Sequence, residues 1–196
     1  MEILDRIGSS REKNRDLAWE GTFEDYLELV IKKPQITRSA HSRVYDMISR
    51  AGWEETSEGR RYRFFAEELF GIESTLQILV EDYLKPAALG LDTKNRILLL
   101  MGPVGTGKST IVNLIKRGLE EYSGTAAGAL YGIKGCPMQE EPLHLVPQEL
   151  RGELEKLGIR IEGSLCPRCR MILEQDFKGE IQEVPVERVF FSEEQR

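Results

Sequence analysis

The sequence predicts an α/β fold whose core is a parallel sheet with helices packed against it. An apolar run at 97–101 leads into a glycine-rich loop and then into an amphipathic run at 110–122, and a second apolar run follows at 129–133. A helix of about eleven residues between two such strands fits a right-handed crossover between parallel neighbours. A helical region precedes this core, at about residues 1–50.

The loop carries the pattern G-x-x-x-x-G-K-[ST], which is typical of phosphate-binding loops that join a buried strand to a helix. Its residues are Gly102, Pro103, Val104, Gly105, Thr106, Gly107, Lys108 and Ser109, followed by Thr110. Glycines let the backbone curl so that its N–H groups face a phosphate, and the helix N-terminus adds a partial positive charge.

Two side chains of the loop have expected chemical roles. Lys108 supplies a cation to the β- and γ-phosphates and is the candidate catalytic residue, and Ser109 supplies a hydroxyl to Mg²⁺. The sequence therefore predicts a P-loop that binds ATP with Mg²⁺. The alternative is a glycine-rich turn that binds nothing.

Net charge, the length of the apolar runs and the cysteine content limit the classes of partner that we expect. The 196 residues carry a net charge of −6, which argues against a general nucleic-acid binder because such binding needs clustered Lys and Arg. No apolar run approaches the roughly 20 residues that span a bilayer, and the N-terminus has no signal pattern. Three cysteines without an export signal indicate a reducing cytoplasm. We therefore expect a cytoplasmic protein with neither nucleic acid nor membrane as partner.

Capping signals predict three helices before the loop. The first begins near Ser9 and stops near Gly21, the second is capped by Thr22 and ends at Pro34, and the third spans about 37–50. The expected apolar faces of the second and third helices are Phe23, Tyr26, Leu27, Val30 and Ile31, and Ala40, Val44, Met47 and Ile48.

Alternation of aromatic and basic residues predicts a small β-hairpin at 53–65. Its Arg-Arg-Tyr-Arg run either touches phosphate or forms a solvated face, and we favour the face. His41 in the third helix is either a catalytic base or partner contact, or a solvated or capping side chain, which is the more frequent case. A further helix at about 73–84 should break or kink at Pro86.

The sequence becomes loop-like after Gly135. A proline-punctuated loop leads to a helix between Pro147 and Gly158, then a short strand at 159–161 and one or two strands at 181–191.

The spacing of Cys166 and Cys169 is that of a zinc knuckle. Cys136 and His144 are the nearest other soft ligands, and together the four residues make a Cys₃His set that could close a tetrahedral site. Two alternatives stay open: reduced thiols without a metal, and a redox pair.

With these segments in view, the chain resembles the PrkA-type bacterial serine protein kinases. The matching stretches are WEGTFEDYLE at 19–28, AHSRVYDMI at 40–48, RILLLMGPVGTGKST at 96–110, KGCPM at 134–138 and IEGSLCPRCR at 161–170. They cover nearly the whole chain. The resemblance implies an AAA+ ATPase domain, with family members much longer than this chain, so the parallel core is expected to be incomplete here.

The resemblance also implies roles for particular residues. In AAA+ proteins a short apolar-Gly-apolar segment ahead of a helix lines the adenine pocket, which assigns that role to Phe70, Gly71 and Ile72; the alternative is an ordinary loop. An acidic pair should follow a second core strand. Residues 189–194 are apolar and then acidic, but we favour an edge strand with a polar tail, with the true pair beyond residue 196.

Three functions follow as hypotheses. The first is transfer of the γ-phosphate of ATP to a protein serine, which the resemblance implies, although the H-R-D and D-F-G kinase motifs do not occur and no acceptor base can be named. The second is an AAA+ ATPase that forms a homo-oligomeric ring and acts on a protein substrate. The third is a module that only binds nucleotide. The expected regions are 1–65 (helical, with the hairpin), 66–135 (P-loop core) and 136–196 (cysteine-containing insertion and terminal strands).

Overall fold

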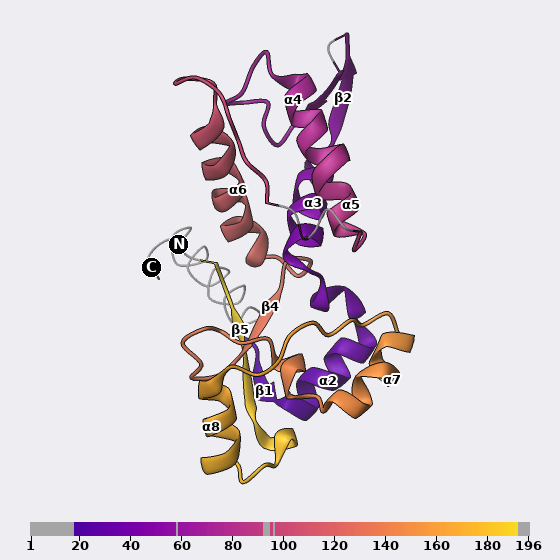
Figure 1. Ribbon diagram of the computed structural model, residues 1–196, viewed down its shortest axis with the longest axis vertical. Helices are drawn as coiled ribbons and strands as arrows, with labels where there is room; N and C mark the ends of the chain where they lie inside the picture. Colours follow the sequence, from indigo (N-terminus) through magenta and orange to yellow (C-terminus); the bar gives the residue numbers. More distant parts are fainter. Residues whose placement is uncertain (1–17, 58, 92–94, 96, 192–196) are drawn as a thin grey trace, which may run out of the picture. The chain divides into compact units, whose positions relative to one another are not determined.

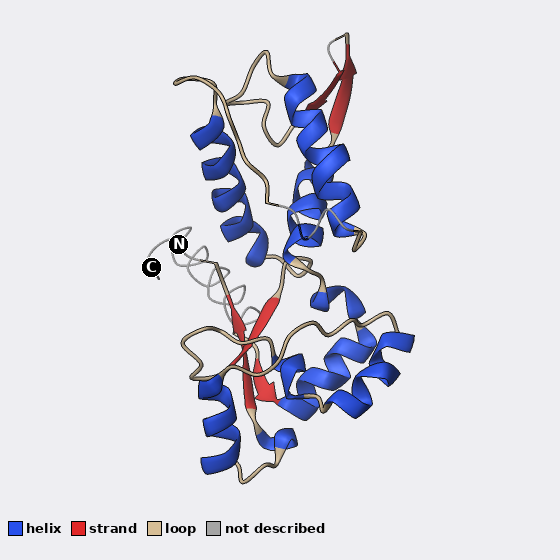
Figure 2. Ribbon diagram, viewed as in Figure 1, coloured by secondary structure: helices blue, strands red, loops and turns tan. Residues whose placement is uncertain are grey.

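The structure is a computed structural model that describes residues 18–57, 59–91, 95 and 97–191. The described chain forms two compact units (Figures 1 and 2). Residues 18–37 and 129–190 make the first unit, and residues 38–128 with Phe191 make the second. The expected boundaries at 65 and 135 therefore fall inside units. The helix expected from Ser9 lies outside the described residues, apart from its last few positions.

The first unit combines a small sheet with short helices. In chain order its elements are β1 (Glu20–Thr22), α2 (Phe23–Lys32), the 3₁₀ turn η1 (Pro34–Thr37), β4 (Leu130–Ile133), the 3₁₀ turns η4 (Pro142–Leu145) and η5 (Gln148–Leu150), α7 (Arg151–Lys156), α8 (Pro167–Gln175), the 3₁₀ turn η6 (Ile181–Glu183) and β5 (Pro185–Val189).

The sheet of the first unit is antiparallel, with strand order β1-β5-β4. β5 is the central strand, so the expectation of an edge strand at this position is wrong. Its Val186 lies opposite Gly21 of β1 on one side and Ile133 of β4 on the other. Val186 and Ile133 are both buried. The pairing of β4 with β5 therefore places two apolar side chains in one core.

The expected parallel sheet is not shown; both sheets of the described chain are antiparallel. Residues 97–101 form no strand, and Ile97 and Met101 are 94% and 81% exposed. The run at 129–133 does become β4, but it pairs with β5 instead of with 97–101. The physical reason is that a strand needs a neighbour for its backbone N–H and C=O groups, and none lies beside 97–101 among the described residues.

Helix α2 begins as predicted. The Thr22 hydroxyl accepts a hydrogen bond from the Asp25 N–H, and the Asp25 carboxylate accepts one from the Thr22 N–H, which completes a capping box. Phe23, Tyr26 and Val30 are buried on its inner face, whereas Ile31 is half exposed. The period of the helix thus placed four of the five expected residues on its packed face, with Leu27 packing at the margin.

Two elements of the first unit were not expected. β1 replaces the predicted end of a helix near Gly21, and α8 begins where a turn was expected. Cys166 caps α8 and Pro167 opens it, which is a start signal that the cysteine spacing concealed. The strand expected at 159–161 does not form, although Ile159 is fully buried.

The second unit is mainly helical. Its elements are α3 (Ala40–Ala51), the hairpin strands β2 (Trp53–Thr56) and β3 (Gly59–Tyr62), α4 (Glu73–Gln77), the π-helical segment η2 (Ile78–Leu84), α5 (Lys85–Ala88) and α6 (Lys108–Ser123). The hairpin is confirmed, with Trp53 opposite Tyr62. Gly52, at φ +81°, ends α3 close to the predicted end of the third helix at about residue 50.

The chain does not break at Pro86. α4, η2 and α5 follow one another without interruption, and Pro86 sits in the first turn of α5. Because Pro86 has no N–H to donate, the backbone accommodates it with a wider π-helical stretch just upstream, which is a known response to an irregularity in a helix.

Helix α6 is held to α3 by polar contacts as well as by the apolar core. The Tyr122 hydroxyl of α6 donates to the Asp46 carboxylate of α3. The buried Arg43 side chain of α3 donates to the carbonyl of Gly128, in the segment that follows α6, at 3.2 Å. The apolar core around them contains Met47, Ile48, Tyr62, Phe65, Leu69, Leu76, Leu79, Val80, Leu84, Ile111 and Leu114. This core fixes the position at which α6 begins.

We expect Thr22→Ala to lower the free energy of unfolding by about 1 kcal/mol, because the first-turn N–H of Asp25 loses its partner. Chemical unfolding followed by circular dichroism measures the change. Thr22→Ser keeps the hydroxyl and is the control. Equal stability of the two variants would contradict the role of the cap.

Candidate functional site

The glycine-rich loop is curled and opens directly into α6. Gly105 and Gly107 have φ values of +84° and +78°, which side chains rarely adopt. A Cβ on Gly107 would also meet Leu69 Cδ2 at 2.8 Å. The sequence therefore uses glycine at position 107 for backbone conformation and for close packing against the segment at 68–72.

The first turn of α6 has the electrostatic character of an anion site. Among the described residues no side chain caps its N-terminal N–H groups, and its first turn contains no acidic residue. The unpaired N–H groups and the helix dipole together produce a partial positive charge there. Lys108, Ser109 and Thr110 all lie in this turn.

The Lys108 ammonium group folds over the loop. Its Nζ donates to the carbonyls of Gly102 and Pro103 at 2.8 and 2.5 Å, and to the Thr106 hydroxyl at 3.0 Å. These acceptors are neutral, so an anionic phosphate oxygen would be a stronger partner for the ammonium group. The arrangement holds the cation at the mouth of the loop, from which it can exchange to a phosphate.

A cavity of about 590 Å³ lies between the loop and the segment that precedes α4. It is lined by Glu68, Leu69, Phe70, Ile72, Val104, Gly105, Thr106, Gly107, Lys108, Ser109 and Thr110. The structure thus brings two of the three residues expected to contact adenine to the glycine-rich loop. Gly71 lies between them in the chain at φ +74° and is not part of the lining.

The cavity contains one carboxylate that the sequence did not single out. Glu68 lines it and forms an ion pair with Arg117 of α6. The expected acidic pair is not brought to the cavity by the described residues, and Glu193 and Glu194 lie outside them. Only its place just before the Leu69–Ile72 segment could have drawn attention to Glu68.

Two further candidates lie apart from the cavity. His41 is half-buried, with its ring 6.3 Å from that of Tyr83 in an edge contact. Two arginines of the hairpin run are matched by acids: Arg60 pairs with Glu55 and Glu81, and Arg63 pairs with Glu54. Arg61 instead donates to the Ala66 carbonyl. These contacts favour the structural interpretation of both features.

The cysteines form a second cluster, in the first unit. The sulfur atoms of Cys136, Cys166 and Cys169 and a carboxylate oxygen of Glu140 all lie within 4.8 Å of one another. The expected set differs in its fourth member, because the two ring nitrogens of His144 contact Glu140 and the Glu162 carbonyl instead of the sulfurs. Sequence reasoning missed Glu140, which lies one helical turn before His144.

Burial perturbs the thiols of this cluster. Burial raises the pKa of Cys169, and hydrogen bonds with the neighbouring thiols raise it further. Burial also acts to raise the pKa of Cys136, but backbone N–H groups of Glu140 and Met138 and the other two thiols together hold that pKa below its usual value.

None of the helices in the described ranges combines the length and the apolar character that a membrane crossing requires.

Comparison with known proteins identifies the family of the chain that contains this loop, its helix and the adjoining cavity. The family model described as "PrkA AAA domain" matches residues 21–196, so the chain belongs to the PrkA AAA-domain family. No solved structure matches the chain.

Three of the similar relatives show how the match is distributed along the chain. The "ATP-dependent protease PrkA" of Bacillus subtilis is 54% identical over 197 aligned residues, which cover the whole chain and 31% of that protein. A Geobacillus stearothermophilus protein from the gldA 5′ region is 52% identical over 97 residues, half of the chain and all of that protein. The "Serine/threonine kinase YeaG" of Escherichia coli K12 is 48% identical over 56 residues, 29% of the chain and 8% of that protein. The chain thus spans about a third of the Bacillus relative.

We expect Phe70→Ala to weaken ATP binding about tenfold, because an aromatic ring in contact with a base contributes about 1–3 kcal/mol. Binding of inorganic triphosphate, which has no base, should not change. Titration calorimetry with both ligands makes the comparison.

Ile78→Ala is the matched control, since Ile78 is an exposed apolar side chain of the same unit outside the cavity. An equal loss of affinity for ATP and triphosphate in Phe70→Ala would contradict a base contact.

Proposed function

We propose that this chain is the ATP- and Mg²⁺-binding domain of a PrkA-like serine protein kinase. The observation that carries the proposal is the cavity that joins the curled loop at the start of α6 to Phe70 and Ile72. Membership in the PrkA AAA-domain family supports it, because an AAA domain is a nucleotide-binding domain.

In this proposal the phosphates bind to the loop and the base to the apolar segment. The amides at 102–110 hydrogen bond to the phosphate oxygens, and Lys108 leaves the carbonyls of Gly102 and Pro103 to bind the β- and γ-phosphates. The Ser109 hydroxyl, exposed in the first turn of α6, holds Mg²⁺. Phe70 and Ile72 contact the adenine.

The chain supplies the phosphate-donor end of the reaction. The carboxylate that lines the cavity, Glu68, is paired with Arg117 and is not placed as a free base. We therefore propose no acceptor base within the described residues. Transfer of the γ-phosphate to a protein serine rests on the family and on the name of the YeaG relative.

A second candidate is a cytoplasmic ATPase that forms a homo-oligomer and acts on a protein substrate. The relative that covers the whole chain is named an ATP-dependent protease, and this name favours the candidate. In that case the phosphate goes to water and the energy drives work on the protein. A third candidate is a domain that binds nucleotide without turnover.

We expect Lys108→Ala to weaken binding of Mg·ATP at least tenfold, because a hydrogen bond to a charged group contributes about 1.5–3 kcal/mol. Titration calorimetry measures it. Lys116→Ala removes the same charge from the same helix away from the cavity and should bind normally. Unchanged affinity in Lys108→Ala would reject the site.

Ser109→Ala tests the metal role separately. We expect its affinity for ATP to fall only when Mg²⁺ is present, because the hydroxyl contacts the ion and not the phosphate. Equal losses with Mg²⁺ and with a chelator would contradict this role.

The fate of the γ-phosphate distinguishes the candidates. Terminally labelled ATP is incubated with the protein and a serine-containing substrate such as casein, and the label in protein, the free phosphate and the cleaved casein are measured together. Labelled phosphoserine supports the kinase. Free phosphate without labelled protein, with or without cleavage of casein, supports the second candidate. Binding of ATP with neither labelled protein nor free phosphate supports the third.

A further inference from the structure

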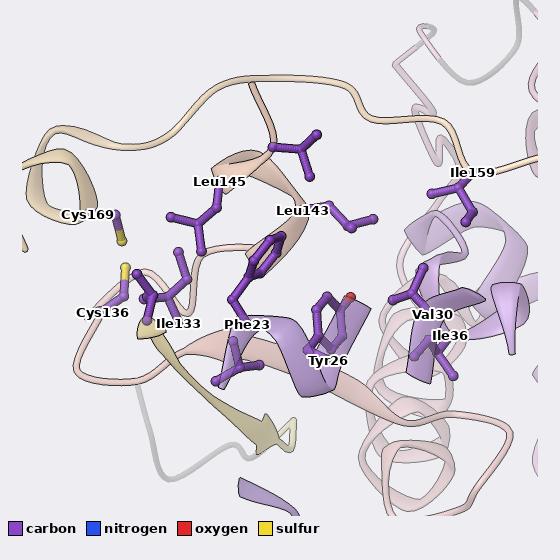
Figure 3. Close-up of a cluster of buried hydrophobic side chains, with 13 residues drawn as sticks. Phe23, Tyr26, Val30, Ile36, Ile133, Cys136, Leu143, Leu145, Ile159 and Cys169 are labelled. Atoms are coloured by element: carbon purple, nitrogen blue, oxygen red, sulfur yellow. The ribbon is translucent and has the colours of Figure 1, made fainter. Parts of the chain in front are cut away.

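All three cysteines of the sequence meet in one place in the first unit. Cys136 follows β4, whereas Cys166 and Cys169 open α8. Cys136 and Cys169 are 6% and 2% exposed, and Figure 3 shows their sulfur atoms pointing toward each other at the edge of the apolar core. The Sγ atoms of Cys136 and Cys166 are 3.9 Å apart, which is far longer than a disulfide bond of about 2.05 Å.

The backbone directs N–H groups at these sulfurs from both sides. The Cys169 N–H donates to Cys166 Sγ at 3.4 Å, because Cys166 is the N-cap of α8. The N–H groups of Met138 and Glu140 donate to Cys136. Such donors stabilise a sulfur that carries negative charge, as a metal-bound thiolate does.

The fourth group is the carboxylate of Glu140. Its Oε1 contacts His144 Nδ1, and His144 Nε2 lies 2.8 Å from the Glu162 carbonyl oxygen. A carbonyl only accepts, so Nε2 must carry a proton. An ionised carboxylate also only accepts, so the contact between Nδ1 and Glu140 needs a second proton, on Nδ1 or on the carboxyl group, and both ring nitrogens are used.

Gly163 makes room for this ring. A Cβ on Gly163 would meet His144 Nε2 at 3.1 Å, and its φ of +104° favours glycine. The absence of a side chain at Gly163 therefore leaves room for the imidazole ring, which contacts Glu140 from this position. A histidine that fixes the carboxylate next to a cation is a common arrangement around metal sites.

We propose that Cys136, Cys166, Cys169 and Glu140 form a structural Zn²⁺ site, with His144 as the residue that positions Glu140. Four protein ligands are the number that closed structural sites use. A tetrahedral ion with Zn–S bonds of about 2.3 Å separates sulfurs by about 3.8 Å, close to the 3.9 Å between Cys136 and Cys166.

The charges also fit. Binding replaces three thiol protons, which pass to the solvent, by one Zn²⁺ ion, and no electron is transferred. Three thiolates and one carboxylate give the occupied site a net charge of −2. With all four positions filled by protein, the ion joins the end of β4 to the start of α8 and has no open position for catalysis.

The wild-type chain provides the first test. Protein purified without chelators from zinc-supplemented cells should contain about one equivalent of zinc by elemental analysis, and three thiols should react only after the metal is removed. Less than about a tenth of an equivalent would overturn the proposal. So would a single free thiol in non-reducing buffer, since it would indicate a redox pair.

The absorption spectrum of bound Co²⁺ then identifies the type of ligand in the same wild-type protein. Co²⁺ added to the apoprotein should produce thiolate-to-cobalt charge-transfer bands and the visible d–d bands of a tetrahedral ion. The absence of both sets of bands would overturn the proposal even if cysteine variants fail to fold.

Two variants separate the fourth ligand from its positioning residue. Glu140→Gln should change the d–d bands, whereas His144→Ala should preserve their shape and weaken zinc binding about 10–100-fold. His41→Ala changes the other histidine of the chain, in the second unit, and should alter neither property. Bands changed by His144→Ala and unchanged by Glu140→Gln would overturn Glu140 as the ligand.

Each unit contains one tryptophan, so that fluorescence can follow the unfolding of the first unit alone once Trp53 is replaced. Trp53→Phe leaves Trp19, which packs against Tyr131 of β4, as the remaining tryptophan. The thermal midpoint read from Trp19 should be several degrees higher with zinc than after chelation. An unchanged midpoint would contradict a stapling role for the ion.

Discussion

The backbone N–H groups at the start of α6 are the constraint on which the second unit depends. A helix end with no side-chain cap must find another acceptor, in water or in a ligand. Here the glycines of the loop, Lys108 and the packing of Gly107 against Leu69 all maintain that uncapped end. The core beneath α6 keeps this helix end in place. Uncapped N–H groups add nothing to the stability of the helix, but they can bind an anion.

Local signals in the sequence predicted local structure well. The Thr22 cap, the glycine that ends α3, the hairpin and α6 all depend on residues close together in the chain. The order of strands could not be found this way. β5 pairs with β1 and β4 because distant apolar residues fit one core, and no short window of sequence contains that information.

The candidate sites show the same division. The motif located the whole of the curled glycine-rich loop, since its residues are consecutive in the chain. The apolar segment at 70–72 needed a family resemblance, and Glu68 needed the structure. Among the cysteines, spacing identified the pair at 166 and 169, but it favoured His144 over Glu140 because histidine is the more usual ligand of zinc. The run at 97–101 shows the limit most plainly: Leu100 packs against the core, while Ile97 and Met101 face outward, and its apolar composition alone could not provide a neighbouring strand.

The first unit is assembled from two pieces of chain with the whole of residues 38–128 between them. A ribosome delivers β1 long before β5, the strand that joins β1 to β4, so the sheet has no centre until the last of its three strands has emerged. The intervening unit has its own core and needs no such wait. During synthesis the unit that contains the glycine-rich loop should therefore fold first. Until β5 emerges, the face of α2 formed by Phe23, Tyr26 and Val30 stays open to chaperones and proteases.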